Sequence, residues 1–141
     1  MFGRDATILS KKGNTWIPRV FHDTQISKDR GYIQRVYGET SNETVIVHIR
    51  SRNGLAEGKY TVYEPKAWDA LQDTSGAVSF KAGDILWLGN WEMVDPQLSP
   101  VPDDDYPKGV YAYLRGKYDC TYSITNIAEF ATLPHWEIAG R

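Results

Sequence analysis

The 141-residue sequence has a single cysteine, Cys120, which excludes an internal disulfide and is typical of proteins from a reducing cytosol. No apolar run approaches the roughly 20 residues of a membrane-spanning helix, and the N-terminal segment lacks the apolar stretch of a secretory signal. Lys and Arg number 16 against 18 Asp and Glu, a net charge of −2. Proteins that neutralise nucleic-acid phosphates normally carry a basic excess. These absences predict a protein without membrane contact and disfavour nucleic-acid binding.

Motifs of catalysis and of ion binding are absent as well. There is no G-x-S-x-G nucleophile motif and no glycine-rich phosphate loop. His22, His48 and His135 lie in or beside strand-like segments, and no pair has the spacing of a helical zinc motif. Cys120 has no neighbouring cation in the sequence that would activate its thiol. We therefore predict no catalytic, cofactor-binding or metal-binding residues, and a protein that is not an enzyme.

Aromatic residues are abundant instead, at 13% of the chain with nine Tyr and five Trp. Tyr and Trp are enriched both in β-strands and at protein interfaces. Turn-forming clusters of Gly, Asn and Asp recur between short strand-like runs, and no repeat or change of composition marks a second domain. The sequence predicts one domain over residues 1–141 with a mainly β fold (all-β or α+β). We expect a small barrel or sandwich of six to eight short strands with two short helices.

The clearest strand is residues 43–50, where Val45, Val47 and Ile49 alternate with residues of the other face. Pro18 predicts an edge strand or a bulge over residues 15–21. Three hairpins are expected, namely 43–50 with 59–65, 77–80 with 84–91, and the two halves of 120–140 around a bend at 126–129. Two helices are expected, over 65–73, with Pro65 in the first turn, and over 103–118, with acidic residues at the N-terminus.

The predicted core consists of apolar residues that alternate along these strands. They are Trp16, Val45, Val47, Ile49, Ile85, Trp87, Phe130, Trp136 and Ile138, with Leu86 and Leu88 as the alternative inward face of their strand. In the last strand, Trp136 and Ile138 are expected to face the core, whereas His135 and Glu137 face outward. An outward His beside a Trp is more often structural than catalytic.

Residues 91–107 predict a long exposed loop, because four prolines interrupt a segment without periodicity. Its apolar residues could anchor a partner protein, and three successive aspartates end it. Such aspartates lack the spacing of a calcium loop and suit the N-terminus of a helix. The predicted partner-contact residues, including two near the C-terminus, are Trp91, Met93, Leu98, Asp103, Asp104, Asp105, His135 and Arg141.

Three segments, taken in order, resemble a family of short proteins from the head-to-tail gene clusters of tailed phages and prophages. They are GNTWIPRVFHDTQIS, KAGDILWLGNWEMVD and KYDCTYSITNIAEFATLPHWEIAGR. The family pattern has a Trp in a first hairpin, a Gly-Asp-hydrophobic strand and a C-terminal element around Pro-His-Trp-Glu. Its positions here are Trp16, Gly83, Asp84, Ile85, Ile124, Thr125, Phe130, Pro134, His135, Trp136, Glu137, Gly140 and Arg141.

The resemblance is to minor capsid or neck proteins, above all to the head-closure (stopper) proteins. It implies a small β-barrel that forms a homo-oligomeric ring of about twelve copies in the virion neck, assembled in the host bacterial cytoplasm. Such a ring joins the portal and adaptor to the tail terminator or tail tube, and packaged DNA passes through its lumen without sequence-specific binding. The resemblance implies no catalysis and no cofactor.

Other functions stay open at this point. A tail terminator, or another neck or minor capsid component, would fit the same resemblance but form a six-membered ring. A small-ligand-binding β-barrel or a hydrolase would instead use an aromatic-lined pocket in a monomer. A barrel for single-stranded nucleic acid would need aromatic residues beside Lys and Arg, which the acidic balance disfavours.

Overall fold

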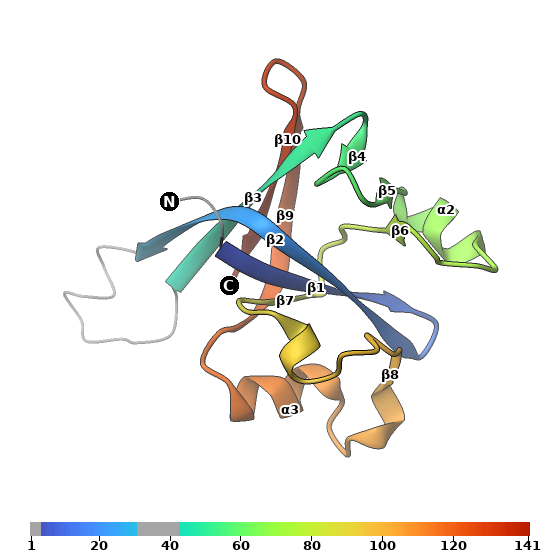
Figure 1. Cartoon of the computed structure of the whole chain (residues 1–141). Coiled ribbons are helices and arrows are strands. Elements are labelled where there is room, and N and C mark those ends of the chain that lie inside the picture. Colours follow the sequence, from blue (N-terminus) through green and yellow to red (C-terminus); the bar gives the residue numbers. More distant parts are fainter. Residues whose placement is uncertain (1–3, 31–42) are drawn as a thin grey trace.

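Six antiparallel strands close into a barrel in the computed structural model, which describes residues 4–30 and 43–141 (Figure 1). In order around the barrel they are β1 (Arg4–Lys12), β2 (Thr15–Arg30), β3 (Glu43–Arg52), β10 (His135–Gly140), β9 (Thr121–Phe130) and β7 (Ile85–Trp87). The barrel closes because β2 is long enough to pair first with β1, as far as Thr24, and then with β3 from Gln25 onward. The predicted small β-barrel is confirmed.

Shorter elements cover the barrel. The short strands are β4 (Leu55–Ala56), β5 (Thr61–Val62), β6 (Ala77–Val78) and β8 (Val101–Pro102). The helices are α2 (Pro65–Ala70) and α3 (Val110–Lys117), with 3₁₀ turns η1 (Trp91–Met93) and η2 (Asp103–Asp105). Pro65 occupies the first turn of α2, as predicted, because its missing N–H has no partner there in any helix. None of the helices in the described part of the chain is long and apolar enough to cross a membrane.

The hydrophobic core has two main parts. Inside the barrel, the alternating residues of β3 and β10, among them Val47 and Ile138, are fully buried. A second cluster lies between the outer side of the barrel and α3 with η1, where Leu9, Ile85 and Leu114 are fully buried. Both faces of β7 are therefore buried, because Leu86 points into the barrel cluster and Ile85 into the outer one.

Eight of the nine predicted core residues are buried, and Phe130 is the exception at 43% exposure. Phe130 ends β9, and its ring lies against the His135 ring and belongs to none of the core clusters. Strand alternation predicted the facing of β3 and β10 correctly, but it could not predict where a strand leaves the core.

A bulge in β2 allows this strand to change partners. Arg4 pairs with Thr24 and Ala6 with Phe21, so β2 holds one residue more than β1 between these two pairs. The backbone N–H groups of His22 and Asp23, within this irregular stretch, donate to the carboxylate of Glu57, at 2.9 and 3.0 Å. The bulge predicted over residues 15–21 is wrong, because these residues pair with β1 in unbroken register, with Pro18 opposite Leu9, and the irregularity follows at residues 22 and 23. The alternative, an edge position, fits Pro18 locally, since the pairings with β8 end at Trp16 and those with β3 begin at Gln25. The residue that stabilises the bulge comes from the connection after β4.

Two of the three predicted hairpins are wrong. After β3 the chain turns at once through Asn53 and Gly54, both with positive φ, so that β3 pairs with β4 rather than with residues 59–65. Residues 61–62 pair in parallel with β6. β7 pairs with β1 and β9 instead of residues 77–80, because the closed barrel offers it a long strand on each side.

The third hairpin, β9–β10, is confirmed, but its bend is not at Asn126–Glu129. These residues continue the ladder, with Asn126 opposite Ala139 and Glu129 opposite Trp136, and the chain turns at residues 131–134. The polar residues at 125, 126 and 129 mark an exposed strand and not a turn.

Candidate functional site

The β9–β10 hairpin stands out beyond the barrel at the top of Figure 1. Its end carries apolar side chains in spite of its exposure, since Leu133 is 78% and Phe130 43% exposed. The ring of Phe130 stacks on the ring of His135, with centroids 4.8 Å apart and planes 7° apart. We call Phe130, Leu133 and Pro134 the hairpin tip. An exposed apolar tip on a projecting element is the composition of a contact surface.

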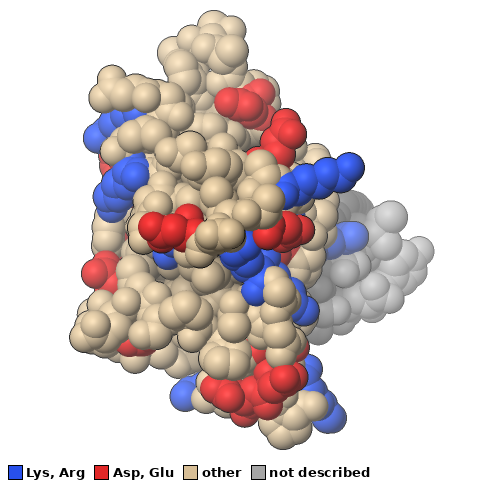
Figure 2. All heavy atoms as spheres, turned by 90° about the vertical axis from the view of Figure 1, so that its right-hand side faces the viewer, with Lys and Arg blue, Asp and Glu red and all other residues tan. Residues whose placement is uncertain are grey.

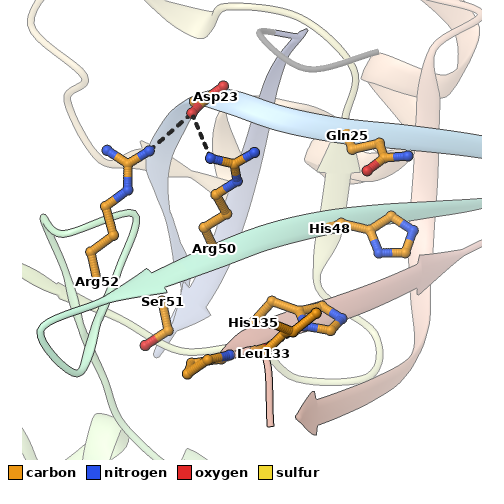
Figure 3. A pocket seen from close by; sticks show the side chains of 9 residues that line it. Asp23, Gln25, His48, Arg50, Ser51, Arg52, Leu133 and His135 are labelled. Atoms are coloured by element: carbon orange, nitrogen blue, oxygen red, sulfur yellow. Dashed lines mark hydrogen bonds and ion pairs between the residues drawn. The ribbon is translucent and has the colours of Figure 1, made fainter. Parts of the chain in front are cut away.

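A hollow of about 430 Å³ lies beside the hairpin tip, on the outer surface of the barrel. Residues of β2, β3 and the β9–β10 hairpin line it, namely Asp23, Gln25, His48, Arg50, Ser51, Arg52, Leu133, Pro134 and His135. Figure 3 shows the two histidine rings on neighbouring strands and the two arginines beside Asp23. The hollow therefore combines cationic, carboxylate, imidazole and apolar groups.

The cations of the hollow are already paired. The Asp23 carboxylate lies 3.1 Å from the Arg52 guanidinium and 3.9 Å from that of Arg50 (Figure 3). All three side chains are about half exposed, so the pairs contribute at most about 1 kcal/mol each to stability. Their effect is to fix the two arginines at one end of the hollow, away from the histidines.

His48, His135 and Glu137 meet on the outward face, because β3 and β10 pair. Glu137 lies directly opposite His48 in the ladder, and His135 is two residues before Glu137 on the same face. His135 Nε2 is 2.9 Å and His48 Nδ1 is 3.7 Å from Glu137 Oε2. The Leu133 carbonyl accepts a hydrogen bond from His135 Nδ1 at 2.6 Å. This bond, followed by the contact with Glu137, raises the pKa of His135 above its ordinary value.

The segment after β7 is not a free loop. Trp91 is 5% exposed and packs edge-on against Trp87, with ring centroids 5.1 Å apart. Leu98 is half-buried against the same cluster, and β8 pairs with Thr15 and Trp16. Of the three predicted apolar anchors only Met93, at 85% exposure, is open to a partner. Sequence composition did not distinguish residues that anchor the segment to its own barrel from residues that face outward.

The three aspartates form η2 and do not begin the helix, which starts at Val110. Asp103 nevertheless serves the helix, because its Oδ1 accepts hydrogen bonds from the Val110 N–H and from Trp16 Nε1, both at 2.9 Å. These bonds, the one from Val110 first, lower the pKa of Asp103. Asp104 and Asp105 are exposed.

Arg141 completes the last β pairing through its backbone, which exchanges two hydrogen bonds with Ser123. Its side chain is exposed. His135 is thus the one predicted contact residue that lines the hollow, and neither Met93 nor the aspartates of η2 are among its lining residues.

Sequence reasoning missed most of the hollow. Asp23, Gln25 and Arg50 come from the consecutive strands β2 and β3, whereas the other side of the hollow comes from the β9–β10 hairpin near the end of the chain. A signal was present in the alternation, since Gln25, His48 and His135 all occupy outward positions of their strands. Without knowledge that β2, β3 and β10 are neighbours, these polar positions could not be placed together.

The comparisons with known proteins give one family. The chain belongs to a family of unknown function, DUF6751, which matches residues 3–141. Neither the curated proteins nor the solved structures contain a match to the chain.

Proposed function

We propose that this DUF6751 chain is a structural subunit of the phage neck, most similar in role to a head-closure ring protein. The proposal begins with the resemblance of the three sequence segments. Two of those segments have defined structural roles, because the Gly-Asp step connects to β7 and the Pro-His-Trp-Glu element forms β10. A six-strand barrel with a projecting hairpin agrees with the compact subunit that such a ring needs.

The observation that carries the proposal is an apolar projection at one end of the molecule and an apolar hollow at the other. Leu133 of the hairpin tip is 78% exposed at the top of Figure 1. At the opposite end, around α3, a hollow of about 300 Å³ is lined mainly by apolar atoms of Tyr106, Pro107, Lys108, Gly109, Ala112 and Tyr113. We call it the α3 hollow.

Such an arrangement suits a head-to-tail contact. When two different faces of one chain are complementary, each copy binds the next, and the series closes into a ring if the rotation between copies allows. The Tyr106 and Tyr113 rings stack at 4.3 Å between centroids and form a rigid wall for an incoming side chain. We propose that the hairpin tip of one subunit enters the α3 hollow of its neighbour.

The surface charge agrees with a lumen through which DNA slides. Figure 2 shows the face that carries α2, where Lys and Arg are interspersed with Asp and Glu and acidic side chains gather at the lower end. The Lys and Arg side chains of the described residues form no continuous surface on this face. Affinity for DNA depends on clustered cations, so a mixed surface permits passage without retention.

A small-ligand barrel is the second candidate, and the hollow at the hairpin tip is the observation that favours it. The inside of the barrel does not serve this function, because its side chains, from Ile8 to Trp136, fill it as a packed core. A ligand would therefore bind on the outer surface, next to a tip that is open for a partner. We favour the ring subunit because it accounts for both apolar surfaces.

Leu133→Asp and Tyr113→Asp are expected to block assembly from opposite sides of the same contact. Leu133→Asp should keep a stability within about 0.5 kcal/mol of the wild type, because the side chain is 78% exposed. Tyr113→Asp should lose about 0.5–1.5 kcal/mol through the lost stacking on Tyr106 and still fold. Neither variant should assemble alone when examined by native mass spectrometry at concentrations where the wild type forms rings. A mixture of the two should form a dimer, since the intact hollow of one can receive the intact tip of the other.

Met93→Asp is the matched control for Leu133→Asp, since Met93 is 85% exposed against 78% for Leu133 and belongs to neither the hairpin tip nor the α3 hollow. It should assemble like the wild type. Normal rings from Leu133→Asp, or no dimer in the mixture, would exclude the proposed contact.

A further inference from the structure

Three metal-ligating groups converge on the outward face of β3 and β10. One nitrogen each of His48 and His135 and a carboxylate oxygen of Glu137 all lie within 4.8 Å of one another. In a tetrahedral zinc site with bonds of about 2.0–2.1 Å, neighbouring ligand atoms are about 3.3 Å apart. The distances from Glu137 Oε2 to the two histidine nitrogens, 2.9 and 3.7 Å, lie on either side of that value. Only small side-chain movements separate this arrangement from a chelate.

The hydrogen bond from His135 to the Leu133 carbonyl determines which nitrogen is free. A carbonyl oxygen can only accept, so Nδ1 must carry the hydrogen of the 2.6 Å contact. In the neutral imidazole the lone pair is then on Nε2, which faces Glu137 Oε2 at 2.9 Å. Two acceptors at this distance repel each other unless a cation, either a proton or a metal ion, lies between them. Histidines that bind metals commonly donate their other N–H to a backbone carbonyl in this way.

Rigid neighbours hold the cluster in place. His48 and Glu137 are a direct cross-strand pair in the ladder between β3 and β10, and Trp136 between the two β10 ligands is buried in the core. The His135 ring is stacked on Phe130. The three side chains are between 24% and 30% exposed, which leaves an open side for a water ligand or a further donor. A site on packed strands loses little conformational entropy when an ion binds.

We infer that His48, His135 and Glu137 form a binding site for a divalent transition-metal ion, with Zn²⁺ as the first expectation. Two imidazole nitrogens and one carboxylate are a donor set that Zn²⁺ and Co²⁺ accept readily, whereas Ca²⁺ and Mg²⁺ prefer oxygen ligands alone. The ion would link β3 to β10 at the base of the hairpin tip. This inference is independent of the proposed neck function, since a metal link could stabilise the hairpin of a protein of any function.

His22 provides a built-in comparison. It also lies between two carboxylates, with Nδ1 3.1 Å from Asp5 and Nε2 3.2 Å from Glu92. Its two contacts use opposite nitrogens of one ring, so the two carboxylates cannot share a single ion with it. Both His22 and His135 lie close to carboxylates. Only the cluster of His48, His135 and Glu137 brings three donor atoms together around one point.

The test is a titration of the full chain with ZnCl₂ at pH 7.5, followed by calorimetry, and with CoCl₂, followed by visible absorption. We expect one ion per chain and the strong visible bands of four-coordinate Co²⁺. His48→Asn, His135→Asn and Glu137→Gln should each weaken Zn²⁺ binding by at least about 10-fold. His22→Asn, the matched control, should bind like the wild type.

Histidine side-chain NMR tests the same Zn²⁺ site in the wild-type chain, without any substitution. On addition of Zn²⁺ the resonances of His135 Nε2 and His48 Nδ1 should shift together, while those of His22 stay unchanged. Saturable binding that follows this pattern supports the site. Three results would overturn it: absence of Zn²⁺ binding by the wild type, binding by His48→Asn and His135→Asn as tight as that of the wild type, or shifts confined to His22.

Discussion

Asp84→Ala is expected to lower the free energy of unfolding by about 3 kcal/mol at pH 7, because it removes a buried carboxylate and leaves the partly buried Lys81 without its partner. The Asp84 side chain is 4% exposed, and its Oδ2 lies 2.9 Å from Lys81 Nζ, which is itself 17% exposed. Asp84 Oδ1 also accepts from the backbone N–H of Lys11 at 3.2 Å, and Lys81 Nζ donates to the Lys11 carbonyl at 2.8 Å. Loss of the carboxylate therefore releases the end of β1 as well as the turn before β7. Chemical denaturation followed by tryptophan fluorescence measures the change.

The same carboxylate should give a characteristic pH dependence. Burial raises the pKa of Asp84 to about 6, although Lys81 and the Lys11 N–H oppose the shift. A carboxyl whose pKa is higher in the folded than in the unfolded chain stabilises the fold below its unfolded pKa and loses this contribution as the pH rises through about 6. The stability difference between wild type and Asp84→Ala should therefore be about 2 kcal/mol larger at pH 4.5 than at pH 7. A difference that is constant, or that grows with pH, would contradict this assignment.

A double variant separates the ion pair from simple packing. Asp84→Ala combined with Lys81→Met removes both charges, and replacing a buried pair by apolar groups is often close to neutral. The double variant should therefore be more stable than Asp84→Ala alone. If the double variant is less stable than Asp84→Ala alone, the unpaired charge of Lys81 does not cause the stability loss of Asp84→Ala.

Glu57→Ala is expected to cost about 2–4 kcal/mol, because two backbone donors of the β2 bulge lose their acceptor. Glu57 is 8% exposed and receives the N–H groups of His22 and Asp23 within the stretch where β2 leaves β1 for β3. It holds this position with φ of 54°, a conformation that is strained for any residue except glycine. The strained backbone of Glu57 is therefore offset by the hydrogen bonds that its carboxylate accepts from the His22 and Asp23 N–H groups, where β2 changes partners. Thermal or urea unfolding of the variant measures the cost.

Lys59→Ala is the control for this prediction. Lys59 Nζ lies 3.2 Å from Glu57 Oε1, but the lysine side chain is 43% exposed, so the pair should contribute at most about 1 kcal/mol. If Lys59→Ala lowers the free energy of unfolding strongly and Glu57→Ala lowers it only slightly, Glu57 stabilises the fold through the ion pair and not through the bulge.

Local sequence patterns predicted correctly those features that depend on neighbouring residues alone, namely the facing of single strands and the start of a helix. The alternation of Val45, Val47 and Ile49 predicted the facing of β3, and Pro65 predicted the start of α2. The Pro-His-Trp-Glu element gave the correct facing of β10 because Trp136 and Ile138 could only point inward. In these cases the period of the side chains is a direct consequence of the backbone geometry.

Pairings between distant strands could not be predicted in the same way. β7 pairs with β1 and β9 because the barrel closes, and no turn-forming residues next to β7 in the sequence indicate these pairings. The buried position of Trp91 has a similar origin, since the Trp87 ring and α3 form its surroundings only in the folded chain. The cluster of His48, His135 and Glu137 depends on the register of β3 with β10, although each residue was correctly placed on an outward face.

The central claim is tested most directly by quantitative mass spectrometry of phage particles, purified after prophage induction from a bacterium that carries the gene, since a neck protein must be encoded by a phage or prophage. A neck ring of about twelve copies predicts this chain in every particle, in about one copy per portal subunit. Particles without the chain should hold neither a closed neck nor an attached tail in electron micrographs. Complete, tailed and infectious particles that contain no copy of the chain would contradict the account.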